Sequence, residues 1–266
     1  MIYISRLQVT LIAFLLLAEL VLSSKAQASF FNFPQLDATM TDSLFRAIGS
    51  TIAFRPIEPA SSLGKVFGIQ VGLGATAVDA SSIASITGSS AFLPFADLQV
   101  GVSIPMGITF EFGLLPSLTL SGASFSRYGG ALKWTATDTV FSALPFDMAV
   151  RVSYSSAAIS GSQTLQGVNI TANYSSGILG AQVLVSKNFF VLEPYLGLGL
   201  MNHSSSLSGA GSVSLFQTGT TAVSGSDMSA WIQAGLLLKL AVFGIGAEYD
   251  NVLGYSSYSG KFSFRF

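Results

Sequence analysis

Apolar and polar residues alternate along most of this chain with a period of two, which is typical of β-strands that have one apolar and one polar face. From Phe67 to Ala77 the odd positions are apolar, and the even positions are glycine, glutamine or threonine. Ten segments share this pattern, at about residues 66–79, 94–104, 106–115, 124–136, 146–158, 177–187, 191–204, 227–240, 243–254 and 257–266. The pattern predicts an all-β fold.

The terminal segment YSGKFSFRF alternates in the same way, and its aromatic side includes the last residue of the sequence. Tyr258, Phe262, Phe264 and Phe266 fall on one face, and polar residues fall on the other. Chain ends are usually polar and frayed. An aromatic stripe here indicates a terminal strand with one face in an apolar environment.

The composition is that of a membrane protein, with 50% hydrophobic and 9% charged residues and a mean hydropathy of +0.61. A membrane-spanning helix needs about 18 or more consecutive, predominantly apolar residues. No such run occurs after residue 30. The apolar residues are therefore spread over the strands, which favours a barrel over a helical bundle.

The polar faces of the predicted strands carry six acidic and six basic residues among glycine, serine, threonine and glutamine. These charges are Asp97, Glu111, Arg127, Lys133, Asp147, Arg151, Glu193, Lys239, Glu248, Asp250, Lys261 and Arg265. A sparse, balanced set is typical of an enclosed barrel lumen, whereas a soluble sandwich has many more charges on its outer face. Only a closed sheet leaves no unpaired edge in a bilayer. The sequence thus predicts a transmembrane antiparallel β-barrel, with these charges inside and the apolar face toward membrane lipid.

The first 28 residues are typical of a secretory signal peptide, with Arg6 before an apolar run and Ala26-Gln27-Ala28 as the cleavage motif. The mature chain is expected to begin near Ser29, with an uncleaved anchor as the alternative. Without the charges of this signal, the chain has 10 basic and 12 acidic residues, which argues against nucleic acid as a partner. The absence of cysteine excludes disulfides and thiolate metal ligands.

The signal, the absence of cysteine, the strands of about ten residues and the aromatic terminal strand together resemble Gram-negative outer-membrane β-barrel proteins over residues 64–266. The resemblance implies the bacterial cell outer membrane as location. It also implies that Tyr258, Phe262, Phe264 and Phe266 form the assembly signal for the barrel-assembly machinery. The stretches KVFGIQVGLGA, LPFADLQVGVSIPMGITFEFG and EPYLGLGL are similar to fatty-acid-transporter-like barrels and their uncharacterised relatives. The hatch domain and ligand residues of that family cannot be placed on this shorter chain.

Ten is an even number, so the start of the first strand and the end of the last strand are both expected on the periplasmic side, where connections are short. The short connections at 105–107, 188–191 and 240–243 then face the periplasm, and the long ones near 80–91, 159–176 and 205–226 face outward. Residues 49–57 and 165–174 could add a further pair. Twelve strands is therefore the alternative.

Residues 29–63 precede the barrel and include a predicted short helix, with Thr41 or Asp42 as N-cap and Gly49 as its end. Many expected lumen positions are glycine, which leaves space inside a barrel. One hypothesis is that residues 29–63 enter the lumen as a plug. The other is that the glycines ease strand curvature and close packing, and that this segment is disordered or lies against the periplasmic rim.

Catalytic chemistry has little support in the sequence, and neither a cofactor nor a metal is predicted. His203 is the only histidine, in the stretch MNHSSS at the end of a predicted strand, and we expect it to be solvated. Trp231 is expected in the interfacial girdle. Glu248 and Asp250 are expected to pair with Lys261 and Arg265 across adjacent strands.

Three functions remain open after the sequence. The first is passive, porin-like transport or binding of a small solute of unknown identity, for which an apolar solute is one option, because the predicted lumen is glycine-rich and nearly neutral. The second is a surface structural or adhesive role of the serine- and threonine-rich outer loops. The third is a protease- or lipase-type enzyme at the rim, which we do not expect. Fold alone does not choose among them.

Overall fold

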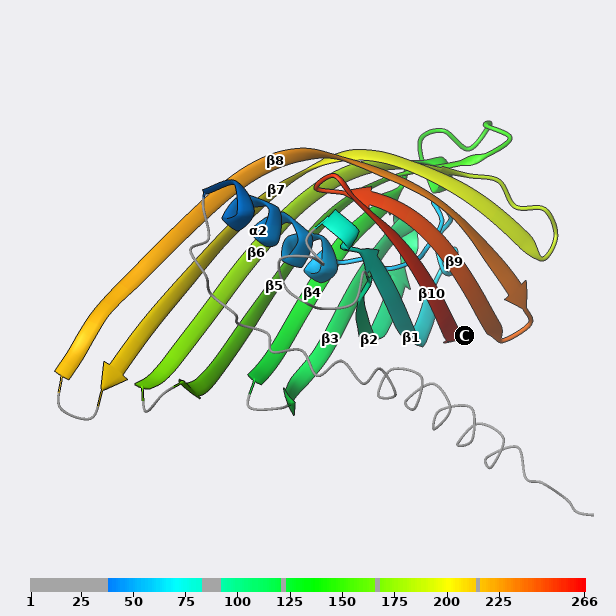
Figure 1. Cartoon of the computed structure of the whole chain (residues 1–266). Helices are drawn as coiled ribbons and strands as arrows, with labels where there is room; N and C mark the ends of the chain where they lie inside the picture. The colour runs from blue at the N-terminus through cyan, green and yellow to red at the C-terminus, as the bar shows by residue number, and fades with distance from the viewer. Residues whose placement is uncertain (1–37, 83–91, 121–122, 166–167, 214–215) are drawn as a thin grey trace, which may run out of the picture.

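Ten antiparallel strands close into one barrel in the computed structural model, which describes residues 38–82, 92–120, 123–165, 168–213 and 216–266 (Figure 1). The strands are β1 (Gly68–Asp79), β2 (Phe92–Ile104), β3 (Ile108–Leu120), β4 (Ala123–Thr135), β5 (Asp147–Leu165), β6 (Val168–Ser186), β7 (Leu192–Val213), β8 (Phe216–Leu240), β9 (Phe243–Val252) and β10 (Tyr255–Arg265). The predicted ten-stranded barrel is confirmed. The twelve-strand alternative is wrong.

The barrel closes between its first and last strands, β1 and β10. Val71 lies opposite Phe264 in this pair, and Ile69 and Phe266 exchange two backbone hydrogen bonds of 2.8 Å each. The final residue is therefore part of the seam. Because every strand has two neighbours, the barrel wall can satisfy its backbone groups inside a bilayer.

Side chains alternate between the lumen and the outside along each strand. On β7 the outward positions Leu196, Leu198 and Leu200 are 52–65% exposed, whereas Tyr195, which precedes them and points inward, is 2% exposed. We call the outward-facing apolar residues of all strands the apolar belt. The belt ends at Leu200 on β7, after which the exposed outward positions are Asn202, Ser204, Ser206 and Ser208.

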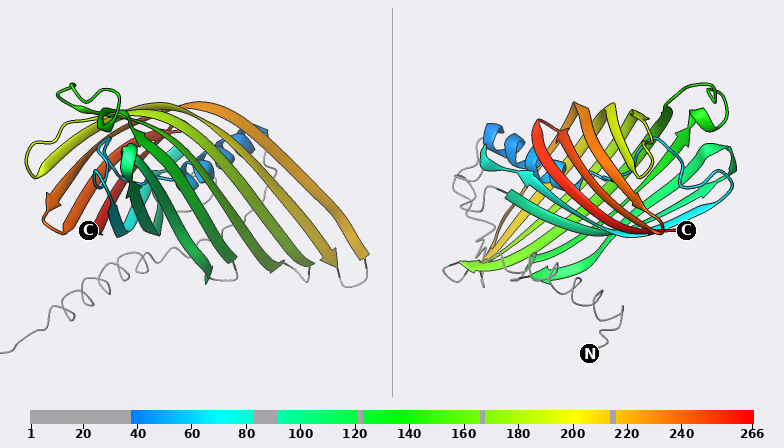
Figure 2. Two further views of the ribbon diagram at one scale, coloured as in Figure 1. Left: turned by 180° about the vertical axis from the view of Figure 1, so that it is seen from behind. Right: turned by 90° about the vertical axis from the view of Figure 1, so that its right-hand side faces the viewer.

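The strands differ greatly in length, so the barrel has a tall wall and a short wall (Figure 2). Strands β9, β10 and β1 have 10 to 12 residues, whereas β7 has 22 and β8 has 25. A tilted strand of about 9–11 residues already crosses the hydrocarbon of a bilayer. The tall wall, β5–β8, therefore extends well beyond the apolar belt.

The prediction of long outer connections at 159–176 and 205–226 is wrong for most of these residues, because β5–β8 continue through them. Both faces of these extensions are rich in serine, threonine, glycine and alanine, so no apolar alternation marks them. Pairing with the neighbouring strand keeps them extended, as in Ser160↔Asn173 and Ser208↔Asn173. Of the third predicted loop, residues 83–91 lie outside the described residues.

The two ends of the barrel are distinct. One, here called the turn end, holds the 3-10 turn η1 (Pro105–Gly107), the turns at 187–191 and 241–242, and Phe266. The other, the open end, holds the β9–β10 turn at Leu253–Gly254 and the projecting tall wall. The turn end also carries the longer connection 136–146, which begins with η2 (Ala136–Asp138).

The helix α2 (Ala38–Ile52) crosses the open end of the barrel (Figure 1). It starts earlier than the predicted N-cap at Thr41 or Asp42 and continues beyond Gly49. Gly49 does not end the helix because it is packed against the wall, where a Cβ would lie 2.7 Å from His203 Nε2. Residues 49–57, considered above as a strand, are the helix end and an irregular stretch in the lumen.

Candidate functional site: the filled lumen

Residues 38–63, here called the plug segment, occupy the interior of the barrel from one end to the other. At the open end, the Tyr255 hydroxyl donates a hydrogen bond of 2.9 Å to the carbonyl of Ser43 on α2. At the turn end, the backbone N–H of Leu63 donates one of 3.0 Å to Ser103 Oγ. Between them residues 52–60 are all buried, with Phe54 2% and Ile57 1% exposed.

An apolar cluster holds the plug segment where the helix ends. Ile52 and Ala53 pack against Met201, Trp231 and Leu253 of the wall. Trp231 is 2% exposed, and its indole N–H donates a hydrogen bond of 2.9 Å to Asp250. The prediction that it lies in the outer girdle is therefore wrong. Alternation places it on the inner face, because its neighbours on that face, Ser229 and Gln233, are polar.

Below this cluster, wall side chains donate hydrogen bonds to the backbone carbonyls of the plug segment. Arg127 donates to Ile52 and Ala53, Gln99 to Arg55, Lys261 to Pro56, Arg151 to Glu58, Lys133 to Pro59 and Ser61, and Thr135 to Ala60, at 2.7–2.9 Å. Residues 53–63 form no helix or strand. Their buried carbonyls need donors from elsewhere, and the lumen wall supplies them.

The same wall cations are neutralised by carboxylates. Arg127 Nη1 lies 2.5 Å from Asp97 Oδ2, and Arg151 Nε lies 3.0 Å from Glu111 Oε2. All four of these side chains are at most 5% exposed. A buried charge without a partner is costly, so each of these cations serves a carboxylate and a carbonyl at once.

The plug segment contributes two buried charges, Arg55 and Glu58, which the alternation pattern does not identify. Arg55 Nε lies 3.4 Å from Asp250, and Glu58 lies 2.9 Å from Lys261 and 3.5 Å from Arg265. The predicted pairing of Glu248 and Asp250 with Lys261 and Arg265 is therefore wrong. The β10 cations pair with the plug segment instead, while Glu248 accepts hydrogen bonds from Tyr195 and Gln233.

The twelve predicted lumen charges divide into two groups. Nine are buried in the interior, namely Asp97, Glu111, Arg127, Lys133, Arg151, Glu193, Glu248, Asp250 and Lys261. The other three, Asp147, Lys239 and Arg265, are partly exposed at the turn end. Lys239 pairs there with Glu193, which also accepts hydrogen bonds from Ser61 and Ser186. This cluster fixes the lower end of the plug segment.

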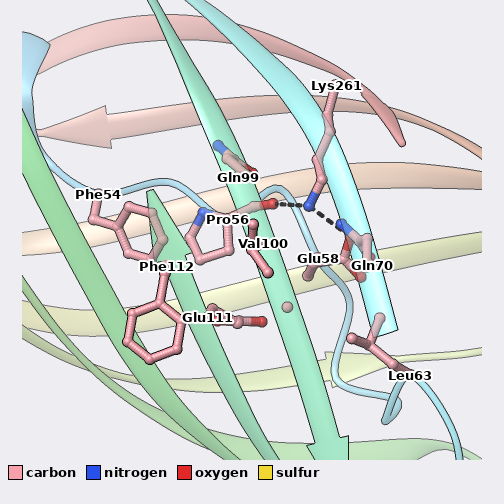
Figure 3. Close-up of a pocket in the computed structure, with 11 residues that line it drawn as sticks. Phe54, Pro56, Glu58, Leu63, Gln70, Gln99, Val100, Glu111, Phe112 and Lys261 are labelled. Carbon is pink, nitrogen blue, oxygen red and sulfur yellow. Dashed lines mark hydrogen bonds and ion pairs between the residues drawn. The ribbon is translucent and has the colours of Figure 1, made fainter. Parts of the chain in front are cut away.

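Little empty space is left around the plug segment. The enclosed cavity next to Pro56, Glu58 and Lys261 has a volume of about 10 Å³ (Figure 3). That is room for about one water molecule. A larger, open cleft of about 460 Å³ lies beside α2 at the open end, where it is lined mainly by hydroxyl groups with Arg46 and Asp79.

His203 is not the solvated residue that the sequence suggests, because it is 2% exposed beneath α2. Its Nε2 lies 2.9 Å from Ser176 Oγ. Among the described residues no carboxylate accepts a hydrogen bond from this histidine, and no group of three potential metal ligands occurs among them either. The Ser176–His203 contact therefore lacks the acid of a hydrolytic triad.

The described helix does not have the length and apolar character needed to cross a bilayer. The closed barrel, the apolar belt and the charged lumen define an outer-membrane-type β-barrel protein whose lumen is filled by its own amino-terminal segment. The chain belongs to a family of unknown function, DUF6588, whose family model matches residues 22–266.

Solved structures with a similar fold include three bacterial proteins. The translocator domain of the autotransporter NalP from Neisseria meningitidis has 9% identity and a TM-score of 0.45, over 86% of this chain and 95% of that one. Ail, the attachment invasion locus protein of Yersinia pestis, has 13% identity and a TM-score of 0.34, over 75% and 97%. The N-terminal β-barrel domain of OprF from Pseudomonas aeruginosa has 14% identity and a TM-score of 0.33, over 75% and 97%. A search of curated proteins found no match.

Proposed function

We propose that this protein is a gated channel of the bacterial outer membrane, and that it conducts a small polar solute when the plug segment leaves the lumen. In this proposal the turn end faces the periplasm and the tall wall faces outward, as the short turns and the position of Phe266 favour. The described state is the closed one.

The polar character of the contact between plug segment and wall is the observation that carries the proposal. Below the apolar cluster, seven of the eight carbonyl contacts come from arginine, lysine or glutamine and one from Thr135. Water can solvate all of these groups once the segment moves. A wall that only had to pack against a permanent plug could be apolar, because well-packed apolar residues often stabilise a protein at least as much as buried ion pairs do.

The same charges change the kind of solute that we propose. The inward glycines alone are compatible with an apolar solute. However, Arg127, Lys133, Arg151 and Lys261 all lie on the wall of the emptied lumen, next to Asp97 and Glu111. A solute with hydrogen-bond acceptors would suit these cations better than an apolar one.

An engineered disulfide between plug segment and wall tests the gating. A Cβ placed on Gly246 would lie 2.8 Å from Ile57 Cγ2, which is compatible with the short Cβ–Cβ separation of a disulfide. The chain has no cysteine of its own, so the double variant Ile57→Cys/Gly246→Cys forms one defined bond. We expect single channels in planar bilayers that stay closed when this variant is oxidised and open at intervals after reduction.

The single variants Ile57→Cys and Gly246→Cys are the matched controls, and their conductance should not respond to the reductant. Openings of equal size and frequency in the oxidised and reduced double variant would rule out movement of this segment as the gate. Absence of openings in wild type and in the reduced variant alike would favour the second candidate function.

The second candidate is a surface structural or adhesive role, and the tall wall favours it. Its exposed outward positions above the belt are small and uncharged, for example Ser160, Asn173, Ser206 and Ser226. Ser175 and Ser206 share a hydrogen bond of 2.8 Å across two strands. Such a paired, uncharged sheet is a contact surface of defined shape rather than a set of loops.

A further inference from the structure

The path of the plug segment places the two ends of the described chain on opposite sides of the barrel. Ten strands return the chain to the side from which β1 started, because ten is even. The segment before β1 adds one more crossing. An odd number of crossings separates Ala38 from Phe266.

The direction of this extra crossing follows from contacts in chain order. Ala47 on α2 packs with Ala80 at the open end of β1. Further along, Glu58 pairs with Lys261 and Arg265 near the middle and lower part of β10. Ser61 then binds Glu193, and Leu63 binds Ser103 next to the turn η1. The chain thus runs from the open end to the turn end before β1 begins.

Exposure along α2 changes in the same direction. Ile52 and Ala47 are fully buried, whereas the Asp42 side chain is 57% exposed. Lower in the lumen, the cavity of about 10 Å³ leaves no room for a second passage of the chain beside the first. The first turns of α2 therefore lie at the open end.

We infer that the chain crosses the barrel once more before β1, from the cell surface to the periplasmic side, so that the first turns of α2 lie at the cell surface. Phe266 stays on the periplasmic side. This inference shares with the proposed function only the orientation of the barrel, and it holds whether or not the plug segment ever moves.

The plug segment must enter the lumen during or after assembly of the barrel wall. The plug segment contacts wall residues from β2, β4, β5 and β10 on different sides of the lumen, including Gln99, Arg127, Arg151 and Lys261. A segment bound on all sides cannot enter sideways through a finished wall. It is in place when β1 and β10 pair, or it threads through the lumen from the periplasm afterwards.

Single cysteines in this cysteine-free chain test the topology by labelling with a membrane-impermeant maleimide on intact cells. Asp42→Cys reports on α2, Ser226→Cys on the exposed outer part of β8, and Phe190→Cys on the fully exposed turn at 187–191. We expect the first two to be labelled in intact cells and the third only after the outer membrane is permeabilised. An epitope inserted between Asp37 and Ala38 should likewise be detected by antibody on intact cells.

Labelling of Asp42→Cys only after permeabilisation, with Ser226→Cys labelled in intact cells, would overturn the inference while leaving the barrel orientation correct. Labelling of Phe190→Cys alone in intact cells would overturn both. Each variant is first checked for heat-modifiable migration, which reports a folded barrel. If the epitope variant does not fold, the Asp42→Cys result decides.

Discussion

At the scale of single residues, the lumen wall consists of cations that each bind two kinds of partner. Arg127 contacts the Asp97 carboxylate, the carbonyls of Ile52 and Ala53, and the faces of Phe54 and Phe95 at 5.6 and 4.7 Å. The guanidinium has five N–H donors in a planar fork and can serve all of these at once. Its removal therefore affects the plug segment and the wall together.

The substitution Arg127→Met should lower the free energy of unfolding by about 3–5 kcal/mol, because it leaves Asp97 buried without its ion-pair partner. Urea titration of the protein in lipid vesicles measures this change. Arg265→Met is the control, since Glu58 keeps Lys261 at 2.9 Å as its ion-pair partner when Arg265 is lost, and the cost should therefore be clearly smaller. Equal losses for the two variants would contradict the role given to Arg127.

The substitution Gly49→Ala tests the contact between α2 and the tall wall. In an open helix this change stabilises by about 0.5–1 kcal/mol. Here the added Cβ would lie 2.7–2.8 Å from His203 and Leu253, so we expect α2 to shift and channel openings to become more frequent. Planar-bilayer recordings give the opening frequency, and the variant Ser43→Ala at a partly exposed position of the same helix serves as control. A decrease in openings would mean that helix propensity outweighs the steric overlap.

The sequence predicts which charged residues face inward, because alternation with a period of two fixes the face of every strand residue. It does not predict their partners. Arg55 and Glu58 lie in an irregular stretch with two prolines, where no periodicity marks a face. Carbonyl groups are present at every residue, so a segment that binds through its carbonyls leaves no signature of side-chain type.

At the scale of elements, strand length is where sequence and structure differ most. Lipid on one side and a polar lumen on the other impose the alternation that reveals the membrane-spanning part of each strand. Above the belt, water faces the outward side of the tall wall, as at Ser204 and Ser206, and the constraint is absent. The ends of β5–β8 are set by pairing between strands, which alternation does not record.

Two arginine substitutions on the outer face of β7 should separate the two parts of this strand. Leu198→Arg, in the belt, should cost about 2–4 kcal/mol if this residue is near the bilayer midplane, and Ser208→Arg, above the belt, about 0–1. Leu198 is 65% exposed and Ser208 is also exposed, so neither change disturbs packing inside the barrel. Folding titrations in vesicles that gave equal costs would place the bilayer elsewhere on the wall.

Removal of Phe266 should reduce the amount of folded protein in the outer membrane. The deletion removes the two hydrogen bonds with Ile69 from the closing seam, together with one of the aromatic residues that we propose the barrel-assembly machinery recognises. Heat-modifiability on gels and fractionation measure the yield. Phe190→Ser is the control, because Phe190 is also exposed but lies in a turn. Unchanged yield for the deletion would argue against the assembly role.

At the scale of the whole molecule, the barrel and its plug segment form one packed unit that leaves no open path beside Pro56 and Glu58. The barrel wall nevertheless has its own continuous strand pairing, which does not include residues 38–63. Without the segment, the wall charges would be solvated by water. The wall should therefore persist when the segment is removed.

Deletion of residues 29–63 should leave a folded barrel and raise single-channel conductance from the closed level to a steady open level. Bilayer recordings combined with heat-modifiability separate the two effects. The control is Ser43→Ala, a variant that keeps the whole plug segment, its length and its charges. A truncated protein that folds but does not conduct would show that the lumen is blocked by something other than this segment.

The difference in height between the two walls makes the mouth of the barrel oblique. Strands β9, β10 and β1 stop near the membrane, while β7 and β8 continue beyond it on the other side of the mouth. Anything that leaves the lumen meets the tall wall on one side and open space above the short wall on the other. Its exit is therefore directed sideways over the short wall, along the plane of the membrane surface. The lipid headgroups and other molecules at the membrane surface, rather than the bulk medium, are therefore the first that an emerging segment or solute would encounter.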